Sequence, residues 1–402
     1  MRAVINKSQA LGVVNAPPSK SYAHRLLIVA ALSKGKSEIN NITLSNDILA
    51  TINCLRTLRK IVIIKDSSII VNNDNNEILD DTLIFDCNES GSTLRFFIPI
   101  ALTTGKKVIF KGTKRLIERG IGPYEEICAK QNIKVEKHDT HIIFEGKLKS
   151  STFNVPGNIS SQFISGLLFA LPLLDGDNKI IITTPIESKN YIDITIDTLS
   201  KSGIRINYEN NIIEIPGNQR FTNQDYTVEG DYSNSAFLDV YNYLNGNVTV
   251  NNLNPNSLQG DKLYKKYFDL LSKENSIIDL SNSIDLGPIM FAFASLKYGG
   301  HFIGTSRLKI KESDRIQDMA KELRKFGVHV TEGDNEVFIE NTNIHSPNED
   351  LDGHNDHRIV MSLVVIASIY GGIITGCEAV NKSFPDFFEK IKSLGIEVEL
   401  YD

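Results

Sequence analysis

The sequence predicts an α/β protein of two domains, in which buried helices are wrapped by sheets. The chain has 402 residues, which exceeds the usual size of a single hydrophobic core, and its 41% apolar and 23% charged residues are ordinary for a globular protein. One pattern occurs six times: polar residues, an apolar run of helix length, a glycine and a short β-rich segment. The closing glycines lie near 35, 105, 176, 246, 300 and 372, so the units recur about every seventy residues, with one shorter interval.

Each apolar run is predicted to be the first helix of a unit, and because it is apolar nearly all round, it is expected to be buried. In chain order the runs are SYAHRLLIVAALSKG, SGSTLRFFIPIALTTG, SSQFISGLLFALPLLDG, SNSAFLDVYNYLNG, DLGPIMFAFASLKYGG and DHRIVMSLVVIASIYGG. A second, amphipathic helix and several strand signals lie between the runs, most clearly in residues 189–217 and 313–340. A chance alternation of helices and strands is the alternative interpretation. A solenoid is disfavoured, because the units carry different polar residues where their first helices start.

Composition limits the possible partners. A formal charge of −6 and a pI near 5.8 give no reason to expect nucleic acid or an anionic membrane surface, so an anionic ligand must be held by a local cluster of cations. The four cysteines form no CxxC pair and no Cys/His grouping, which predicts reduced thiols and no metal site. The N-terminus lacks a signal-peptide core, and the run IVMSLVVIASIY is too short to span a membrane, so a soluble cytoplasmic protein is expected.

The starts of the first helices carry the residues most suited to chemistry. A helix N-terminus offers unpaired N–H groups and the positive end of a dipole, and it therefore suits phosphate and carboxylate ligands. Several starts add cations or hydrogen-bonding side chains: Lys20, Ser21 and Arg25; Ser90, Ser92 and Arg95; Ser160, Ser161 and Gln162; and His357 with Arg358. Repeated elements of this kind predict a ligand with several anionic groups.

A further cationic stretch, RLKIKESDRI, contains Lys309, Lys311, Glu312 and Arg315 where another helix begins. Lys311 and Arg315 are four residues apart and are predicted to share a helix face around one carboxylate, which could act as a base and return the proton as an acid. The alternative is a solvated charge network. Other candidates also have simpler interpretations as a cap, a turn residue or surface charge: Asp285, Ser188, Lys382, Arg115 and Arg119.

Nine segments, taken together and in order, resemble the enolpyruvyl transferase family, and within it the members that act on shikimate 3-phosphate. They are APPSKSYAHR, ESGSTLRF, SSQFISGLL, SKNYIDIT, VEGDYSNSAF, IDLGP, IKESDR, NDHRIVM and NKSFPDFF, and they cover essentially the whole chain. The resemblance implies a two-domain inside-out α/β barrel of six βαβαββ units with the ligands in the interdomain cleft. It also implies that residues 1–17 plus 229–402 form a discontinuous domain and that residues 18–228 form an inserted one.

The resemblance also assigns roles to individual residues. Shikimate 3-phosphate is expected to contact Lys20, Ser21, Arg25, Ser160, Ser161, Gln162, Ser188, Asp285 and Lys311. Phosphoenolpyruvate is expected to contact Lys20, Gly91, Arg119, Gln162, Arg315, Arg358 and Lys382. Catalysis is expected from Lys20, Asp285 and Glu312, and the resemblance leaves open which carboxylate moves which proton. No metal or organic cofactor is implied, and a monomer is expected.

Two alternatives remain. A UDP-N-acetylglucosamine enolpyruvyl transferase would carry a reactive cysteine in a mobile loop of the inserted domain, but residues 111–124 contain none and Cys128 falls in a predicted helix. A non-catalytic binding protein on the same scaffold would be indicated by loss of Lys20, Asp285 or Glu312, and all three are present. Departures from the family pattern include Glu89, Gly120 and Arg307.

Overall fold

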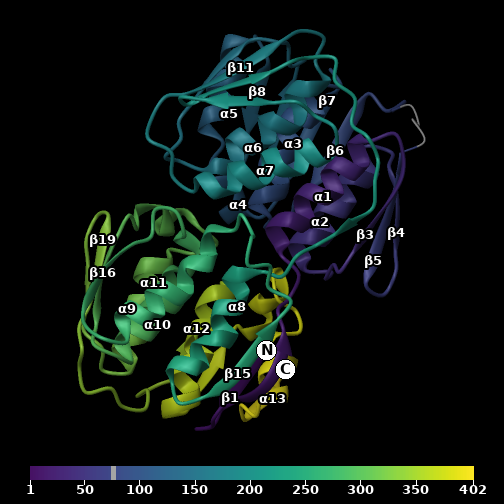
Figure 1. Cartoon of the computed structure of the whole chain (residues 1–402). Coiled ribbons are helices and arrows are strands. Elements are labelled where there is room, and N and C mark those ends of the chain that lie inside the picture. Colours follow the sequence, from purple (N-terminus) through teal and green to yellow (C-terminus); the bar gives the residue numbers. More distant parts are fainter. Residues whose placement is uncertain (74–77) are drawn as a thin grey trace. The chain divides into compact units, whose positions relative to one another are not determined.

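The structure is a computed structural model that describes residues 1–73 and 78–402. It contains two compact units, shown in Figure 1. The discontinuous unit consists of Met1–Pro17 and Gly230–Asp402, and the inserted unit consists of Pro18–Glu229. Each unit has its own hydrophobic core, so the chain builds two separate interiors.

The inserted unit is built around three helices: α1 (Lys20–Leu32), α3 (Gly91–Leu102) and α6 (Ser161–Ala170). Nearly every residue of these helices is buried, as their all-round apolar composition predicts. The other helices of the unit are α2 (Asn46–Thr57), α4 (Lys114–Glu118), α5 (Gly122–Lys130) and α7 (Lys189–Lys201). The amphipathic α7 buries one side, including Ile194 and Thr198, and its other side is more exposed to solvent.

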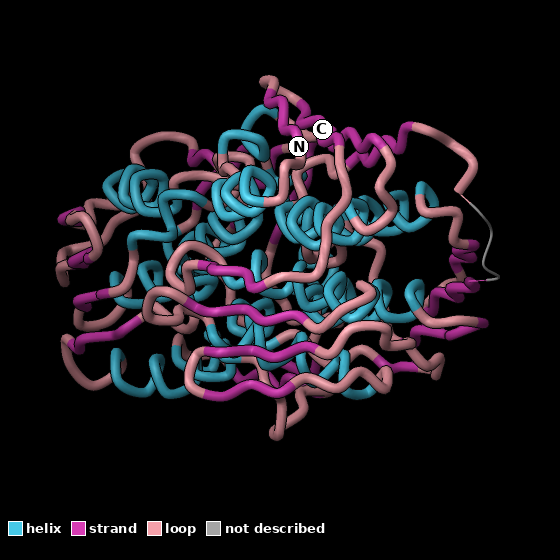
Figure 2. Tube along the Cα trace, turned by 90° about the horizontal axis from the view of Figure 1, so that it is seen from above, coloured by secondary structure: helices cyan, strands magenta, loops and turns pink. Residues whose placement is uncertain are grey.

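Three four-stranded sheets cover these helices, and they share one topology. Their strand orders are β14 (Tyr226–Thr227), β3 (Gly35–Asn40), β5 (Ser68–Asn73), β4 (Ile61–Ile64); β6 (Thr82–Asp86), β7 (Lys107–Lys111), β9 (His141–Glu145), β8 (Lys134–Lys137); and β10 (Thr152–Val155), β11 (Asn178–Ile182), β13 (Ile212–Ile215), β12 (Asn207–Glu209). The first two strands of each sheet are parallel and the remaining pairs are antiparallel. Alternate residues are buried, as in β6 and β7, so one face packs on helices, and Figure 2 shows strands lying across helices in this way.

The discontinuous unit repeats the plan. Its helices are α8 (Tyr232–Asp239), α9 (Tyr264–Leu271), α10 (Gly287–Ser295), α11 (Arg315–Lys325), α12 (His357–Tyr370) and α13 (Phe387–Ser393). Its sheets are β16 (Ser276–Asp279), β17 (Gly300–Ile303), β19 (Glu336–Ile339), β18 (Val330–Glu332); β20 (Leu351–Asp352), β21 (Gly372–Thr375), β1 (Arg2–Ile5), β22 (Val398–Tyr401); and the pair β15 (Asn247–Asn251), β2 (Leu11–Asn15). The inserted unit also contains the short 3-10 helix η1 (Leu171–Leu173). The 3-10 helices of the discontinuous unit are η2 (Val240–Tyr243), η3 (Gly260–Leu263), η4 (Ile284–Leu286), η5 (Ser306–Ile310) and η6 (Cys377–Lys382).

The predicted α/β class with six repeated units is confirmed. The short interval between the glycines at 246 and 300 has a structural cause, because the unit that starts at α8 has only the two-stranded sheet β15–β2 and lacks the two further antiparallel strands that the other five sheets contain. Each sheet stays open, so no closed barrel forms in the part of the chain that the structure describes. Among residues 1–73 and 78–402, no helix has the length and apolar character needed to cross a membrane.

Candidate functional site

Arg315 lies at the centre of a cluster of charged side chains in the discontinuous unit. It is the first residue of α11, where the carboxylate of Asp314 caps the helix by accepting from the N–H groups of Ile316 and Gln317. The Arg315 side chain is 1% exposed. Its guanidinium donates to Asp285 Oδ1 at 2.9 Å, to Glu312 Oε2 at 2.7 Å and to Asp356 Oδ2 at 2.8 Å. Three carboxylates from three segments of the chain are thus held by one buried cation.

Asp285, in η4, is surrounded by cationic side chains. Lys311 Nζ donates to Asp285 Oδ1 at 3.1 Å, and Arg358 Nη2 lies 3.5 Å from Asp285 Oδ2. Burial alone would raise the pKa of Asp285, but the charges of Lys311, Arg358 and Arg315 outweigh it and hold the pKa well below its ordinary value. Burial lowers the pKa of Lys311 despite the opposing charge of Asp285. Asp285 is therefore ionised at neutral pH.

Asp356 and Arg358 join the cluster from the start of α12. Asp356 caps this helix by accepting from the Arg358 N–H at 2.9 Å, while its second oxygen accepts from Arg315. Arg358 Nη2 also donates to Ser233 Oγ of α8 at 3.0 Å. One residue before the cap, the carbonyl of Asn355 accepts from Lys382 Nζ at 2.5 Å. The turn before α12 therefore contacts three residues that the sequence predicted as ligands of phosphoenolpyruvate: Arg315 and Lys382 through their side chains, and Arg358 through its main-chain N–H.

In the inserted unit, α1 brings two cations to its first turns. Lys20 Nζ pairs with Asp47 Oδ2 of α2 at 2.7 Å. Arg25 is 2% exposed, and its guanidinium donates to Thr195 Oγ1 at 2.8 Å, to the carbonyl of Ser21 at 2.7 Å and to the carbonyl of Tyr191 at 3.0 Å. No carboxylate among the described residues forms an ion pair with it, and burial lowers the pKa of Arg25 to about 10. Arg25 is thus a buried cation bonded only to neutral acceptors.

The starts of α3 and α6 are linked by side chains. Arg95 Nη1 donates to Gln162 Oε1 at 2.6 Å, and Gln162 Nε2 donates to Ser92 Oγ at 3.0 Å. The guanidinium of Arg119 lies against the start of α3, where a Cβ on Gly91 would be only 3.0 Å from its Nη2. Only glycine at position 91 leaves this space to the guanidinium without displacement.

The remaining predicted residues lie at neighbouring helix starts of the same unit. Ser160 caps α6 by accepting from the Gln162 N–H at 3.3 Å, and Ser161 is the first residue of that helix and is buried. Ser188 directly precedes α7 without a side-chain capping hydrogen bond and is 2% exposed, with a left-handed backbone at φ 55° and ψ 42°. Since a left-handed serine is uncommon, the chain at this point is held by its surroundings.

The cluster around Arg315 differs from the sequence expectation in three respects. Lys311 lies before α11 rather than on a helix face with Arg315; the two meet because both donate to Asp285 Oδ1. The charges are not a solvated network, since Arg315 is almost completely buried. Lys309 points elsewhere and donates to the carbonyl of Gly333 at 3.3 Å.

Sequence reasoning missed several partners of the predicted residues. Asp356 could have been found, because an aspartate directly before a helix start is a typical cap, whereas Ser233 and Asp47 carry no signal that links them to Arg358 and Lys20. Arg307, a departure from the family pattern, is buried and donates to the carbonyl of Ser281.

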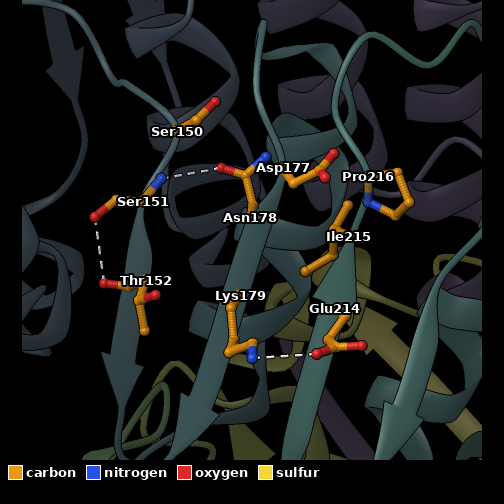
Figure 3. A pocket seen from close by; sticks show the side chains of 9 residues that line it. All are labelled: Ser150, Ser151, Thr152, Asp177, Asn178, Lys179, Glu214, Ile215 and Pro216. Carbon is orange, nitrogen blue, oxygen red and sulfur yellow. Dashed lines mark hydrogen bonds and ion pairs between the residues drawn. The ribbon is translucent and has the colours of Figure 1, made fainter.

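A hollow of about 530 Å³ on the inserted unit is separate from these residues. Figure 3 shows that it is lined by the beginnings of β10 and β11 and the end of β13, and that its polar groups bond to one another, as in the ion pair between Lys179 and Glu214 at 3.1 Å. None of its lining residues is a predicted ligand. No group of three or more His, Cys, Asp or Glu side chains among the described residues is arranged to hold a metal ion.

Comparison with known proteins places the chain in a family. The family model described as EPSP synthase (3-phosphoshikimate 1-carboxyvinyltransferase) matches residues 5–391. The 3-phosphoshikimate 1-carboxyvinyltransferases of Clostridium kluyveri and Clostridioides difficile are 40% and 39% identical to this chain, over 98% of it and 97% and 98% of their own lengths. A solved structure of EPSP synthase from Acinetobacter baumannii aligns with this chain over 100% of both chains, with a TM-score of 0.79 and 20% sequence identity, which shows the same fold.

Proposed function

The chain belongs to the EPSP synthase family, and we propose that the two sets of cations described above hold its two substrates. The chain is a transferase of the shikimate pathway of aromatic biosynthesis: it transfers the enolpyruvyl group of phosphoenolpyruvate to shikimate 3-phosphate and releases phosphate. Both substrates carry a phosphate and a carboxylate, so each needs several cations shielded from water.

Shikimate 3-phosphate is assigned chiefly to the inserted unit. The proposed ligands are Lys20, Ser21, Arg25, Ser160, Ser161, Gln162 and Ser188, with Asp285 and Lys311 from the discontinuous unit. The observation that carries this assignment is Arg25, a buried guanidinium that forms no ion pair with a carboxylate of the described residues. A buried charge without a counter-charge is costly, and an anionic ligand removes that cost.

Phosphoenolpyruvate is assigned to Lys20, Gly91, Arg119, Gln162, Arg315, Arg358 and Lys382. In the inserted unit, the Arg119 guanidinium lies at the N-terminus of α3, where free N–H groups and a cation favour the same anion. In the discontinuous unit, the guanidinium of Arg315 is held by Asp356, that of Arg358 by Ser233 and Asp285, and Lys382 by the carbonyl of Asn355. These contacts orient the cations before the substrate arrives.

Lys20, Asp285 and Glu312 are the proposed catalytic residues. The reaction requires addition of the 5-hydroxyl oxygen to C2 of phosphoenolpyruvate with protonation at C3, followed by loss of a proton and of phosphate. Asp285 and Glu312 share these proton transfers, and Lys20 stabilises the charge of the leaving phosphate. An anionic substrate that binds Arg315 and Arg358 weakens their hold on Asp285 and so raises the pKa of that carboxylate, which makes it a better base.

The proposed ligands are divided between the two units, so each substrate contacts both of them. We take residues 1–17 plus 229–402 and residues 18–228 as the functional domains, each of which supplies ligands to both substrates. The proposal includes a monomeric, cytoplasmic enzyme and no metal or organic cofactor, since lysine and arginine supply the positive charge.

The alternative, a UDP-N-acetylglucosamine enolpyruvyl transferase, is not favoured. Residues 111–124 contain no cysteine, and Cys128 lies in α5. Cys128 is 1% exposed, and burial raises its pKa to about 12, so that it is a neutral thiol at pH 7.

The test is phosphate release by the purified chain. Release is expected with shikimate 3-phosphate and phosphoenolpyruvate together and with neither alone. UDP-N-acetylglucosamine serves as the competing acceptor: release with this sugar nucleotide, and none with shikimate 3-phosphate, would reject the proposal.

The matched variant is Glu312→Gln, which keeps the size of the side chain and one acceptor oxygen for Arg315. It is expected to lower kcat by about 10²-fold or more, the usual contribution of a general acid or base, while binding of shikimate 3-phosphate in titration calorimetry is retained. A near-normal kcat would remove Glu312 from the catalytic set.

A further inference from the structure

The turn between β20 and α12 has an unusual backbone. His354 and Asn355 are both left-handed, with φ of 48° and 51°. As at Asn210 and Asn211, two left-handed residues in succession make a tight turn, and histidine and asparagine adopt this conformation more readily than most residues. Directly after them, the main chain must place the carboxylate of Asp356 against Arg315. The geometry of the turn therefore bears on the cations that follow it.

The side chain of His354 anchors this turn to α11. Its Nε2 lies 2.8 Å from Glu322 Oε1, and its Nδ1 lies 3.3 Å from Asp318 Oδ1. A neutral imidazole has only one N–H and would turn a lone pair toward one of the two carboxylates. Nε2 forms a hydrogen bond with Glu322 and Nδ1 lies within ion-pair distance of Asp318, so the arrangement fits the positively charged imidazolium form.

The groups around His354 support the charged form. On α11 they are Asp318, Glu322 and Lys325, and Lys325 Nζ lies 2.9 Å from Glu322 Oε2. On β20, the carboxylate of Asp352 accepts from the main-chain N–H of His354 at 2.8 Å. Glu322 is completely buried and also accepts from the Asp352 N–H at 3.0 Å, so it requires positive charge beside it.

The direction of the His354 titration agrees with this geometry. Burial would lower the pKa of His354, but the hydrogen bond to Glu322 and the charge of Asp318 outweigh it and raise the pKa above 6.5. A base with a raised folded pKa stabilises the fold fully below its unfolded pKa and loses this contribution as the pH rises through the folded value. The contacts of His354 with Asp318 and Glu322 are therefore intact at slightly acid pH and weaken as the pH rises.

We propose that His354, clamped between Asp318 and Glu322, is a positioning residue that sets the turn before α12 for binding of phosphoenolpyruvate. It acts through two groups of the turn. The carboxylate of Asp356 accepts from the guanidinium of Arg315 and from the main-chain N–H of Arg358 at the start of α12. The carbonyl of Asn355 accepts from Lys382. The inference rests on the proposed assignment of phosphoenolpyruvate to these three cations. His354 itself touches neither the substrate nor the reacting atoms.

The experiment compares the wild type with His354→Asn. Asparagine tolerates a left-handed backbone, so this variant keeps the turn accessible while removing the charge and one donor. The KM for phosphoenolpyruvate is measured from about pH 6 to about pH 9, a range that brackets a raised histidine pKa. The expected KM of His354→Asn is about tenfold above wild type at the acid end, as for loss of a charged hydrogen bond, and the two values converge as the pH rises.

Asp318→Asn gives a signature that a general loss of packing would not produce. In a protein that keeps His354, the KM for phosphoenolpyruvate should rise with pH as the imidazolium loses its proton. Removing the Asp318 carboxylate lowers the pKa of His354, so this rise should occur at lower pH in Asp318→Asn than in the wild type. The titration of the His354 ring, followed by NMR in the ligand-free protein, should move to lower pH by the same amount. A ratio of the His354→Asn and wild-type KM values that stays constant over the whole range, or a rise that does not move in Asp318→Asn, would overturn the inference.

Arg358→Gln separates this inference from the proposed function. It removes a proposed direct ligand and should raise the KM at every pH. If Arg358→Gln leaves the KM unchanged, the assignment of phosphoenolpyruvate is wrong and the inference fails with it. If Arg358→Gln raises the KM while the His354→Asn ratio does not depend on pH, only the inference is wrong.

Discussion

Two arginines, Arg25 and Arg315, are buried to nearly the same degree but have opposite electrostatic surroundings. Arg315 donates to three carboxylates, which outweigh burial and raise its pKa, whereas Arg25 donates to hydroxyl and carbonyl oxygens, and burial lowers its pKa to about 10. Replacement of each by methionine, which has a similar apolar stem, should therefore have different consequences.

Arg315→Met is expected to lower the free energy of unfolding by about 3–5 kcal/mol, because it leaves buried carboxylates without their shared cation. Without that cation the pKa values of Asp285 and Asp356 rise, so the loss should be largest near neutral pH and should shrink as the pH falls and these carboxylates are protonated. Urea unfolding at several pH values measures this. The control is Arg324→Met on the same helix, whose exposed pair with Glu332 should contribute under about 1 kcal/mol.

Arg25→Met should leave the free energy of unfolding of the ligand-free protein within about 1 kcal/mol of wild type, because an uncompensated buried charge is removed together with its hydrogen bonds. Binding of shikimate 3-phosphate should nevertheless be lost in titration calorimetry. Unfolding of the ligand-free variant at much lower urea would show that Arg25 stabilises the fold, and retained binding would show that it is not a ligand.

At the scale of single residues, the sequence predicted which cations matter better than what holds them. Lys311 and Arg315 were chosen for a shared helix face, yet they meet at Asp285, thirty residues before Arg315 in the chain, in a different element. Contacts of this kind depend on how η4 and α11 pack, which no local spacing encodes. Asp356 is the exception, since its role as a helix cap is a local signal.

Among the elements, the pair α3 and α6 shows how closely the buried helices pack. A Cβ at Gly166 would overlap the hydroxyl of Tyr124 and the carbonyl of Arg95. That hydroxyl lies 2.7 Å from the Arg95 carbonyl and 3.0 Å from the Phe163 carbonyl, with its one hydrogen shared between the two acceptors, so it bridges the two helices. Both helices carry proposed ligands at their starts, and their separation therefore sets the distance between those ligands.

Gly166→Ala is expected to destabilise the inserted unit by about 1–3 kcal/mol or more, because the helices must separate or Tyr124 must lose its bonds. Gly122→Ala is the matched control, since a Cβ there meets nothing within 4 Å and a helical alanine should stabilise by about 0.4–1 kcal/mol. Urea unfolding followed by circular dichroism compares the two variants. Equal effects would show that the close contact of α3 and α6 is not limiting.

The buried helices were predictable because their sequences are apolar all round, which leaves no wet face for a surface position. Strand partners were less accessible from the sequence. β1 at the N-terminus pairs with β21 and β22 near the C-terminus, and nothing in residues 2–5 indicates this pairing. The absence of two antiparallel strands from the sheet of β15 was visible only as a short interval between glycines.

At the scale of the whole molecule, the chain passes between the two units twice, and hydrogen bonds join residues on either side of these passages. Ser19 N–H donates to the Glu229 carbonyl at 2.8 Å within the inserted unit, and Asp231 N–H donates to the Pro17 carbonyl at 2.8 Å within the discontinuous unit. The two connections thus run side by side. Paired connections of this kind can act as a hinge, because a few backbone angles absorb the motion.

Shikimate 3-phosphate should therefore draw the two units together, because its proposed ligands lie in both: Arg25 in one unit and Lys311 in the other. Small-angle scattering is expected to show a smaller radius of gyration at saturating shikimate 3-phosphate than without ligand. In Lys311→Met, which removes one ligand of the discontinuous unit, the decrease should be smaller at a concentration that saturates the inserted unit. An unchanged radius of gyration in the wild type, with binding confirmed by calorimetry, would mean that one unit alone accommodates shikimate 3-phosphate and that closure must await phosphoenolpyruvate.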